Sequence, residues 1–175
     1  MKRFKRLLAV ASAVVGIALT GALAAQANQQ ATPDAQLSTV EDYAYPGADQ
    51  IFATYGVRLI SGDGHIMAAD CAIPSSGPLG LIEVHTTEHI GPDQKGLICF
   101  KVIGSSGSLS LQVPKAYEIR GDGRVPGAGH KVRAELTTEA GEHTTVDVNP
   151  SGSTPVGIGT GSNTPTTLLK LIASL

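Results

Sequence analysis

The residues His85-Thr-Thr-Glu-His89 spell H-x-x-E-H, a pattern in which two imidazoles and a carboxylate can serve a catalytic zinc ion. That chemistry needs both histidines on one face of a helix, about one turn apart. Here the motif continues the run Leu81–Val84, contains two β-branched threonines and leads into Gly91-Pro92. In an extended chain four residues span about 13 Å, which is too far for two imidazoles to share one ion. We therefore expect a strand end with exposed histidines and no metal site.

A second motif, Arg120-Gly121-Asp122, is an RGD tripeptide. On an exposed hairpin it presents a cation and a carboxylate at a fixed separation, which is what an integrin binds. However, the sequence Gly-Asp-Gly also occurs at Gly62–Gly64, and it is common in turns because glycine adopts positive φ angles. We predict an ordinary turn here.

Two further patterns lack the surroundings that their chemistry requires. Gly157-Ile-Gly-Thr-Gly161 is similar to part of a dinucleotide loop, but no strand–turn–helix pattern surrounds it, so we predict a loop. A Ser/His/Asp triad can be assembled on paper, but nothing singles out a nucleophile. The five histidines are expected to be solvated strand or loop residues: His65, His85, His89, His130 and His143. The sequence thus predicts no catalytic residue, no cofactor and no metal.

The first 27 residues have the organisation of a signal peptide. Four basic residues precede an uncharged apolar run from Leu7 to Leu23, and Ala25-Gln-Ala27 supplies the small-x-small pattern of a cleavage site, after Ala25 or Ala27. A transmembrane anchor is the alternative, but the run is shorter than the usual span of about 20 residues. We predict a secreted, extracellular protein with a signal peptide over 1–27, a flexible lead-in over 28–42 and no membrane span after cleavage.

Cys71 and Cys99 are the only cysteines, and each lies at or within a predicted strand. In an exported chain this pair favours a disulfide, which closes a loop of about 28 residues and stabilises the fold by about 3–4 kcal/mol. Buried free thiols or a catalytic thiol are the alternatives. The loop Ala72–Leu79 carries two prolines, and the disulfide would stiffen it. Small secreted protease inhibitors preorganise a convex loop in this way, so an inhibitor or a hydrolase is the alternative function.

Composition narrows the range of partners. The whole chain has a net charge of −2, but four of its 13 basic residues lie in the leader, so nine basic residues face 15 acidic ones, a balance of −6. This acidic balance disfavours nucleic acid and anionic lipid. The chain has no Trp, which weakens a carbohydrate-binding role and leaves Val, Ile, Leu and Ala to build the core. Three of its four tyrosines lie in one N-terminal segment, at Tyr43, Tyr45 and Tyr55.

The periodicity of apolar residues predicts one domain over 43–175. Pro46 near the start and Gly56 just past the end indicate a short helix over 48–55, with an apolar stripe of Ile51, Phe52 and Tyr55.

After Gly56 the period changes to two, as in strands. The runs are 57–60, 65–70, 81–87, 97–103, 109–113, 131–136, 145–148 and 166–172. Ser61-Gly-Asp-Gly64 favours a tight hairpin between the first two runs, and 152–161 is expected to be a long loop or an irregular edge. We predict a mainly β fold, an antiparallel β-sandwich of about eight strands with a short N-terminal helix.

Four segments of this domain resemble a known group of proteins. They are Tyr45-Pro-Gly-Ala-Asp49, Leu59–Ile66 leading to Asp70-Cys71, Cys99-Phe-Lys-Val102 and Tyr117–Gly123. The segments resemble stretches of secreted β-domain proteins of Streptomyces-like actinobacteria, and of non-catalytic C-terminal regions of their extracellular peptidases. The resemblance covers roughly Tyr43 to Ile172. It implies an exported β-domain with one disulfide and no active-site residues.

These observations lead to a functional hypothesis. An export signal, no coherent catalytic constellation and a strand-rich scaffold with variable loops indicate a secreted, non-catalytic domain. We expect it to bind an extracellular protein or a component of the cell envelope. The oligomeric state is left open by the sequence.

Overall fold

The structure is a computed structural model that describes residues 43–72 and 77–175. The predicted signal peptide, the lead-in over 28–42 and the centre of the loop after Cys71 lie outside the described residues. All described residues belong to one compact unit, Val40–Leu175. Within them, no helix combines the length and the apolar character needed to cross a membrane.

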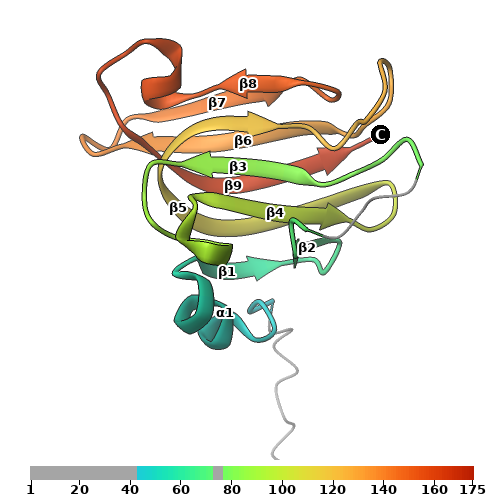
Figure 1. The fold of residues 1–175 in the computed structure, drawn as a ribbon, viewed down its shortest axis with the longest axis horizontal. Helices are drawn as coiled ribbons and strands as arrows, with labels where there is room; N and C mark the ends of the chain where they lie inside the picture. Colours follow the sequence, from blue (N-terminus) through green and yellow to red (C-terminus); the bar gives the residue numbers. More distant parts are fainter. Residues whose placement is uncertain (1–42, 73–76) are drawn as a thin grey trace, which may run out of the picture. The chain divides into compact units, whose positions relative to one another are not determined.

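The described part of the chain is mainly β, with one α-helix and nine strands (Figure 1). The helix α1 spans Ala48–Tyr55, as predicted. The strands are β1 (Arg58–Gly62), β2 (Ile66–Ala69), β3 (Ile82–Thr86), β4 (Leu97–Val102), β5 (Ser106–Arg120), β6 (Lys131–Thr138), β7 (His143–Val148), β8 (Ser153–Pro155) and β9 (Thr166–Ser174). Two 3-10 helices, η1 (Pro92–Gln94) and η2 (Gly157–Thr160), lie between strands. The predicted antiparallel β fold with a short N-terminal helix is confirmed.

Strand β5 connects the two layers of this fold. All pairings are antiparallel, and the main path through the sheet is β2-β4-β3-β5-β9-β6-β7. The first half of β5 pairs with β1 and β9, whereas its second half pairs with β3 and β8. Between the halves the register shifts, and Lys115 has a φ of 48°. An irregularity of this kind bends a strand, so β5 passes from one layer into the other.

The layers enclose a single apolar core built almost entirely of aliphatic side chains. Ile82, Val84 and Phe100 contribute from β3 and β4, and Leu111 and Leu168 from β5 and β9, all fully buried. Phe100 is the one aromatic side chain buried in the described part of the chain. The composition-based prediction of a Val, Ile, Leu and Ala core is therefore confirmed.

The predicted hairpin at Ser61–Gly64 is wrong. β1 pairs with β5 and β2 pairs with β4, so the two neighbours in sequence do not pair with each other. Asp63 provides the physical reason. Its carboxylate accepts hydrogen bonds from the N–H groups of His65 (3.0 Å) and Ser108 (2.9 Å), and its own N–H donates to the Ser108 carbonyl. These bonds attach the segment between β1 and β2 to the start of β5, and β1 and β2 diverge from this point.

Candidate functional site

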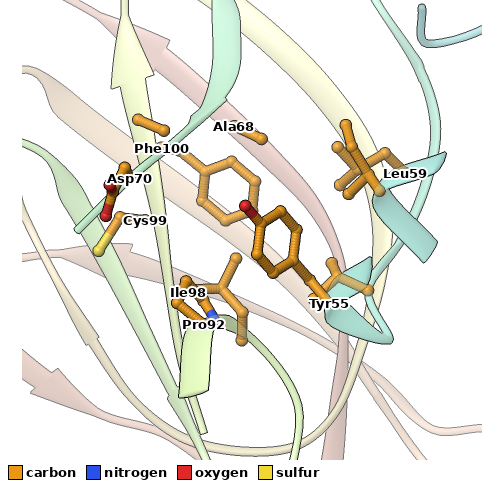
Figure 2. Close-up of a pocket in the computed structure, with 11 residues that line it drawn as sticks. Tyr55, Leu59, Ala68, Asp70, Pro92, Ile98, Cys99 and Phe100 are labelled. Atoms are coloured by element: carbon orange, nitrogen blue, oxygen red, sulfur yellow. The ribbon is translucent and has the colours of Figure 1, made fainter. Parts of the chain in front are cut away.

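An apolar pocket lies in the space between β1 and β2, where the predicted hairpin would have closed the sheet (Figure 2). Its volume is about 170 Å³. Its main apolar contributors are Leu59 of β1, Ala68 of β2, Ile98 and Phe100 of β4, and Ile51 and Tyr55 of α1. In Figure 2 the rings of Tyr55 and Phe100 lie near each other, one from the helix and one from the core.

Tyr45 spans the gap between the two strands and helps to hold it open. Its backbone N–H donates to the carbonyl of Ile60 in β1 (3.0 Å), and its hydroxyl oxygen accepts from the N–H of Ala68 in β2 (2.8 Å). That N–H would otherwise be available to a neighbouring strand. A side chain thus takes the bond that a β1–β2 ladder would have used.

The helix α1 covers the pocket without being buried itself. Ile51 and Tyr55, one turn apart, line the pocket, and no residue of the helix is buried. The helix ends at Gly56, whose φ is 71°, and a Cβ there would lie 2.9 Å from the side chain of Ile90. The carbonyl of Tyr55 accepts a bond from the N–H of Gly91 (2.6 Å), which ties the helix end to the body of the domain.

Two aromatic side chains of α1 remain at the surface. Phe52 is 46% exposed and Tyr55 is 39% exposed. The guanidinium of Arg58 lies 4.7 Å from the centroid of the Phe52 ring, a cation–π distance. Of these two rings, Tyr55 lines the pocket, whereas Phe52 lies on the same helix outside the pocket lining.

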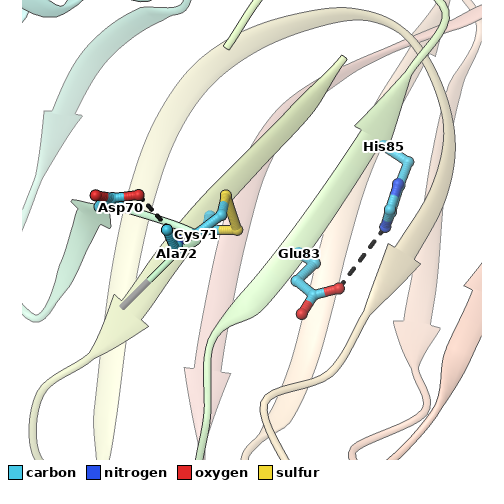
Figure 3. Close-up of a disulfide and its surroundings, with 6 residues drawn as sticks. Asp70, Cys71, Ala72, Glu83 and His85 are labelled. Carbon is cyan, nitrogen blue, oxygen red and sulfur yellow. Dashed lines mark hydrogen bonds and ion pairs between the residues drawn. A yellow bond between two sulfur atoms is a disulfide. The ribbon is translucent and has the colours of Figure 1, made fainter. Parts of the chain in front are cut away.

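The predicted disulfide between Cys71 and Cys99 is confirmed, with its Cα atoms 5.3 Å apart (Figure 3). Cys99 lines the apolar pocket, and the bond fixes the end of the short strand β2 to β4. Asp70 provides the one charged side chain among the residues that line the pocket. One of its oxygens accepts a bond from the N–H of Ala72 (2.9 Å).

On the other side of the disulfide lies a second, polar pocket of about 280 Å³. Cys71, Glu83, Arg120 and Arg124 are among the residues that line it. The loop after Cys71, which the alternative hypothesis assigned to a protease inhibitor, begins next to this pocket, but its centre, 73–76, is outside the described residues.

His85 lies in the strand β3, as predicted for the H-x-x-E-H segment. Its Nε2 is 3.8 Å from a carboxylate oxygen of Glu83 and 4.0 Å from one of Glu118, and its ring centroid is 5.8 Å from that of Tyr117. The bond to Glu83 is drawn in Figure 3. Within 43–72 and 77–175 no group of three or more His, Cys, Asp or Glu side chains is arranged to hold a metal ion. The cluster is an arrangement of partly exposed polar side chains on β3 and β5.

The prediction that His130 is a solvated residue is wrong, and the RGD segment does not form the exposed hairpin that an integrin would need. The RGD aspartate does not project from an exposed turn, because Asp122 is 2% exposed, and His130 is not solvated, because it is 1% exposed. Asp122 accepts from the backbone N–H of His130 (2.8 Å) and its second oxygen lies 2.6 Å from His130 Nδ1. The other ring nitrogen lies 3.0 Å from the carbonyl of Gly104. Both ring nitrogens therefore lie within hydrogen-bonding distance of protein oxygens. The buried ring connects Asp122 with Gly104 and is not accessible to a substrate as a base.

The glycine-rich segment has more structure than predicted. The region expected to be a loop or irregular edge, 152–161, contains the edge strand β8 and the helix η2. A Cβ on Gly159 would lie 1.9 Å from the carbonyl of Tyr117. Because glycine has no Cβ, the segment can pack directly against β5 at this position.

Two groups outside the pocket have shifted pKa values. Partial burial acts to raise the pKa of Asp63, but the hydrogen bonds from the N–H groups of His65 and Ser108 outweigh it and lower the pKa below its usual 3.8. The pKa of Lys115 is raised by its hydrogen bond and ion pair with Glu88, at 2.6 Å. Both groups stabilise connections between strands.

The residues of the apolar pocket were not predicted as a site. One signal was present, because the tyrosines and Phe52 are concentrated around the helix. The position of the pocket depends on β1 and β2 separating, which no local pattern showed.

A scan against models of protein families finds none that matches this chain, and a search of curated proteins finds no matching relative. The functional argument therefore rests on the geometry of the chain itself.

Proposed function

We propose that this chain is a secreted, non-catalytic domain that binds an extracellular protein, and that the pocket between β1 and β2 receives one apolar side chain of that partner. The observation that carries the proposal is the placement of the aromatic residues. In a chain with no Trp and three Phe, Phe52 and Tyr55 lie exposed on a helix beside an apolar pocket. Aromatic anchors next to a pocket are typical of the energetic centre of protein interfaces.

The size of the pocket favours a protein partner over a small molecule. Sites for small molecules usually have volumes of about 300–1,000 Å³. The volume here, about 170 Å³, is smaller and suits a single side chain. The exposure of such an apolar area to water is unfavourable, so a partner that covers it gains binding free energy.

The chemistry of the lining supports binding rather than catalysis. General acid–base catalysis needs at least one positioned proton donor or acceptor next to a second reacting group. Asp70 is the one ionisable carboxylate lining this pocket, and it already accepts a bond from Ala72. Secretion rests on the signal-like residues 1–27, and a disulfide is consistent with an oxidising compartment.

The test uses a library of displayed peptides, selected on the immobilised protein. We expect enriched peptides to share one bulky apolar residue. Ala68→Leu places three additional carbon atoms at the wall of the pocket and should reduce binding of these peptides by at least about tenfold, which corresponds to about 1.4 kcal/mol. Ala53→Leu is the matched control, because Ala53 is exposed on α1 and does not line the pocket. It should leave binding unchanged.

The same two variants also distinguish a protein partner from a cell-envelope ligand. Extracellular proteins retained by the wild-type protein and by Ala53→Leu, but not by Ala68→Leu, would identify the partner. Retention on purified cell-envelope material that Ala68→Leu does not alter would instead favour an envelope ligand at another surface. Peptide binding that is equal in both variants would refute the proposed pocket.

A further inference from the structure

The strand β7 is an exposed edge of the sheet. It ends the path β2-β4-β3-β5-β9-β6-β7, and among the described residues it pairs with β6 alone. Its residues His143, Thr144, Thr145 and Asp147 are exposed. The pairing with β6 runs over six residue pairs without a register shift, so the strand is regular over its whole length.

Other edges of the sheet are protected. The outer edge of β1 is covered by the segment that contains Ala44 and Tyr45, which bonds to Ser61 and Ile60. β8 has three residues and ends in proline. Natural proteins block exposed edges with lysine, proline or bulges, because an open edge pairs with other strands. β7, with the sequence His-Thr-Thr-Val-Asp-Val, has no lysine, proline or bulge, and Asp147 is its one acidic side chain.

The hairpin between β6 and β7 determines which groups of β7 point outward. Thr138 N–H donates to the Glu142 carbonyl (2.9 Å), and Gly141 N–H donates to the Thr138 carbonyl (3.0 Å). Because hydrogen-bonded and non-hydrogen-bonded pairs alternate along an antiparallel ladder, the pair of Thr138 with Glu142 makes the next pair, Thr137 with His143, non-hydrogen-bonded. The alternation then leaves the N–H and C=O groups of His143, Thr145 and Asp147 facing away from β6.

We propose that two copies of this chain associate through β7, which pairs antiparallel with the β7 strand of the partner, with Thr145 on the twofold axis. In this register Thr145 faces the partner's Thr145, and His143 faces the partner's Asp147. All six outward N–H and C=O groups of each strand then find a partner. A shift by two residues in either direction leaves one outward-facing residue of each strand without a partner.

The side chains make the same register favourable. His143, Thr145 and Asp147 lie on one face of the strand, because side chains alternate with a period of two. The register places an imidazole beside a carboxylate twice, once on each side of the axis, and an imidazole N–H can donate to a carboxylate oxygen across a strand pair. Asp147 already lies 3.3 Å from Nε of Arg133 through one oxygen, and its second oxygen remains open to the imidazole. A symmetric, self-complementary contact of this kind closes at two copies.

The experiment is sedimentation equilibrium of the purified protein over about 5 to 500 µM, a range that brackets the affinity of a short strand-to-strand contact. We expect a monomer–dimer equilibrium in the wild-type protein. Thr145→Pro removes an N–H that points away from β6, so it keeps the bonds inside the sheet and should abolish the dimer. A thermal unfolding curve verifies that this variant is folded.

His143→Asp faces the partner's Asp147 with a like charge and should weaken the dimer by about tenfold. The swap His143→Asp with Asp147→His restores an imidazole opposite a carboxylate and should recover most of the affinity. A wild-type protein that is monomeric over the whole range would overturn the proposal. A dimer that survives Thr145→Pro would exclude the edge of β7, and one that His143→Asp leaves unchanged would exclude this register.

Discussion

The buried pair of Asp122 and His130 makes the sharpest stability prediction. We expect Asp122→Ala to lower the free energy of unfolding by about 3–5 kcal/mol, because the buried imidazole and the backbone N–H of His130 both lose their hydrogen-bond partner. Both side chains are at most 2% exposed, so water cannot replace the lost carboxylate. The segment around Asp122 also contacts two other loops. The Asp122 carbonyl accepts from the N–H of Gly80, and the N–H of Gly123 donates to the carbonyl of Pro150.

The magnitude follows from the bonds that are lost. The carboxylate accepts from the His130 backbone N–H at 2.8 Å and lies 2.6 Å from Nδ1. Each buried polar group left without a partner costs about 1–3 kcal/mol, and two groups are orphaned in Asp122→Ala. Asp122→Asn is milder, because its oxygen can still accept from the backbone N–H while its amide donates to Nδ1. We expect a cost of about 1–2 kcal/mol for this variant.

The assay is equilibrium unfolding in guanidinium chloride at neutral pH, with the disulfide intact. Asp147→Ala is the matched control, since Asp147 also pairs with a basic side chain but its side chain is 83% exposed. An exposed pair contributes little, so this variant should change stability by less than about 1 kcal/mol. Equal effects of Asp122→Ala and Asp147→Ala, or of Asp122→Ala and Asp122→Asn, would refute the reasoning from burial and orphaned bonds.

Three further outcomes are expected. Replacing Cys71 and Cys99 together by Ala should lower the free energy of unfolding by about 3–4 kcal/mol, because the 28-residue separation leaves a loop unconstrained in the unfolded chain; a chemical denaturation curve measures it. The carboxyl of Asp63 has a lowered pKa in the folded state, so its contribution to stability is present above the usual pKa of 3.8 and is lost as the pH falls through the folded value. The difference in unfolding free energy between wild type and Asp63→Asn should therefore shrink between pH 6 and pH 2, as measured by unfolding at each pH. A constant difference would contradict this prediction. Gly96→Ala should destabilise by at least about 2 kcal/mol more than Gly47→Ala in thermal unfolding, because both have φ near 70° but only a Cβ at Gly96 meets a backbone oxygen at 2.2 Å.

Local patterns predicted the helix and most strands well. The helix over 48–55 was found at its predicted bounds, because Gly56 ends it through a positive φ that a single residue encodes. Strands β3, β4, β6 and β9 lie within a few residues of their predicted ranges. The second half of β5 was missed, because Pro114 and Lys115 interrupt the alternation at the bend where the strand changes layers.

The candidate site was not predictable in the same way. The hairpin prediction at Ser61–Gly64 considered local turn chemistry alone, whereas Asp63 binds Ser108, a residue 45 positions later in the chain. The prediction of a solvated His130 failed for a similar reason, since its partner is Asp122, which no spacing rule connects with it. In both cases a hydrogen bond to a residue outside the motif decided how the motif is arranged.

The sequence by itself determined the class of the fold, the helix and the scarcity of aromatic side chains, because these depend on composition, on periodicity and on residues close together in the chain. Only the tertiary structure decided which strands pair, and therefore where the apolar pocket and the open edge of β7 lie. The physical reason is that a strand pattern shows which face is buried but not which neighbour accepts its hydrogen bonds. That choice is made by contacts between residues far apart in the chain.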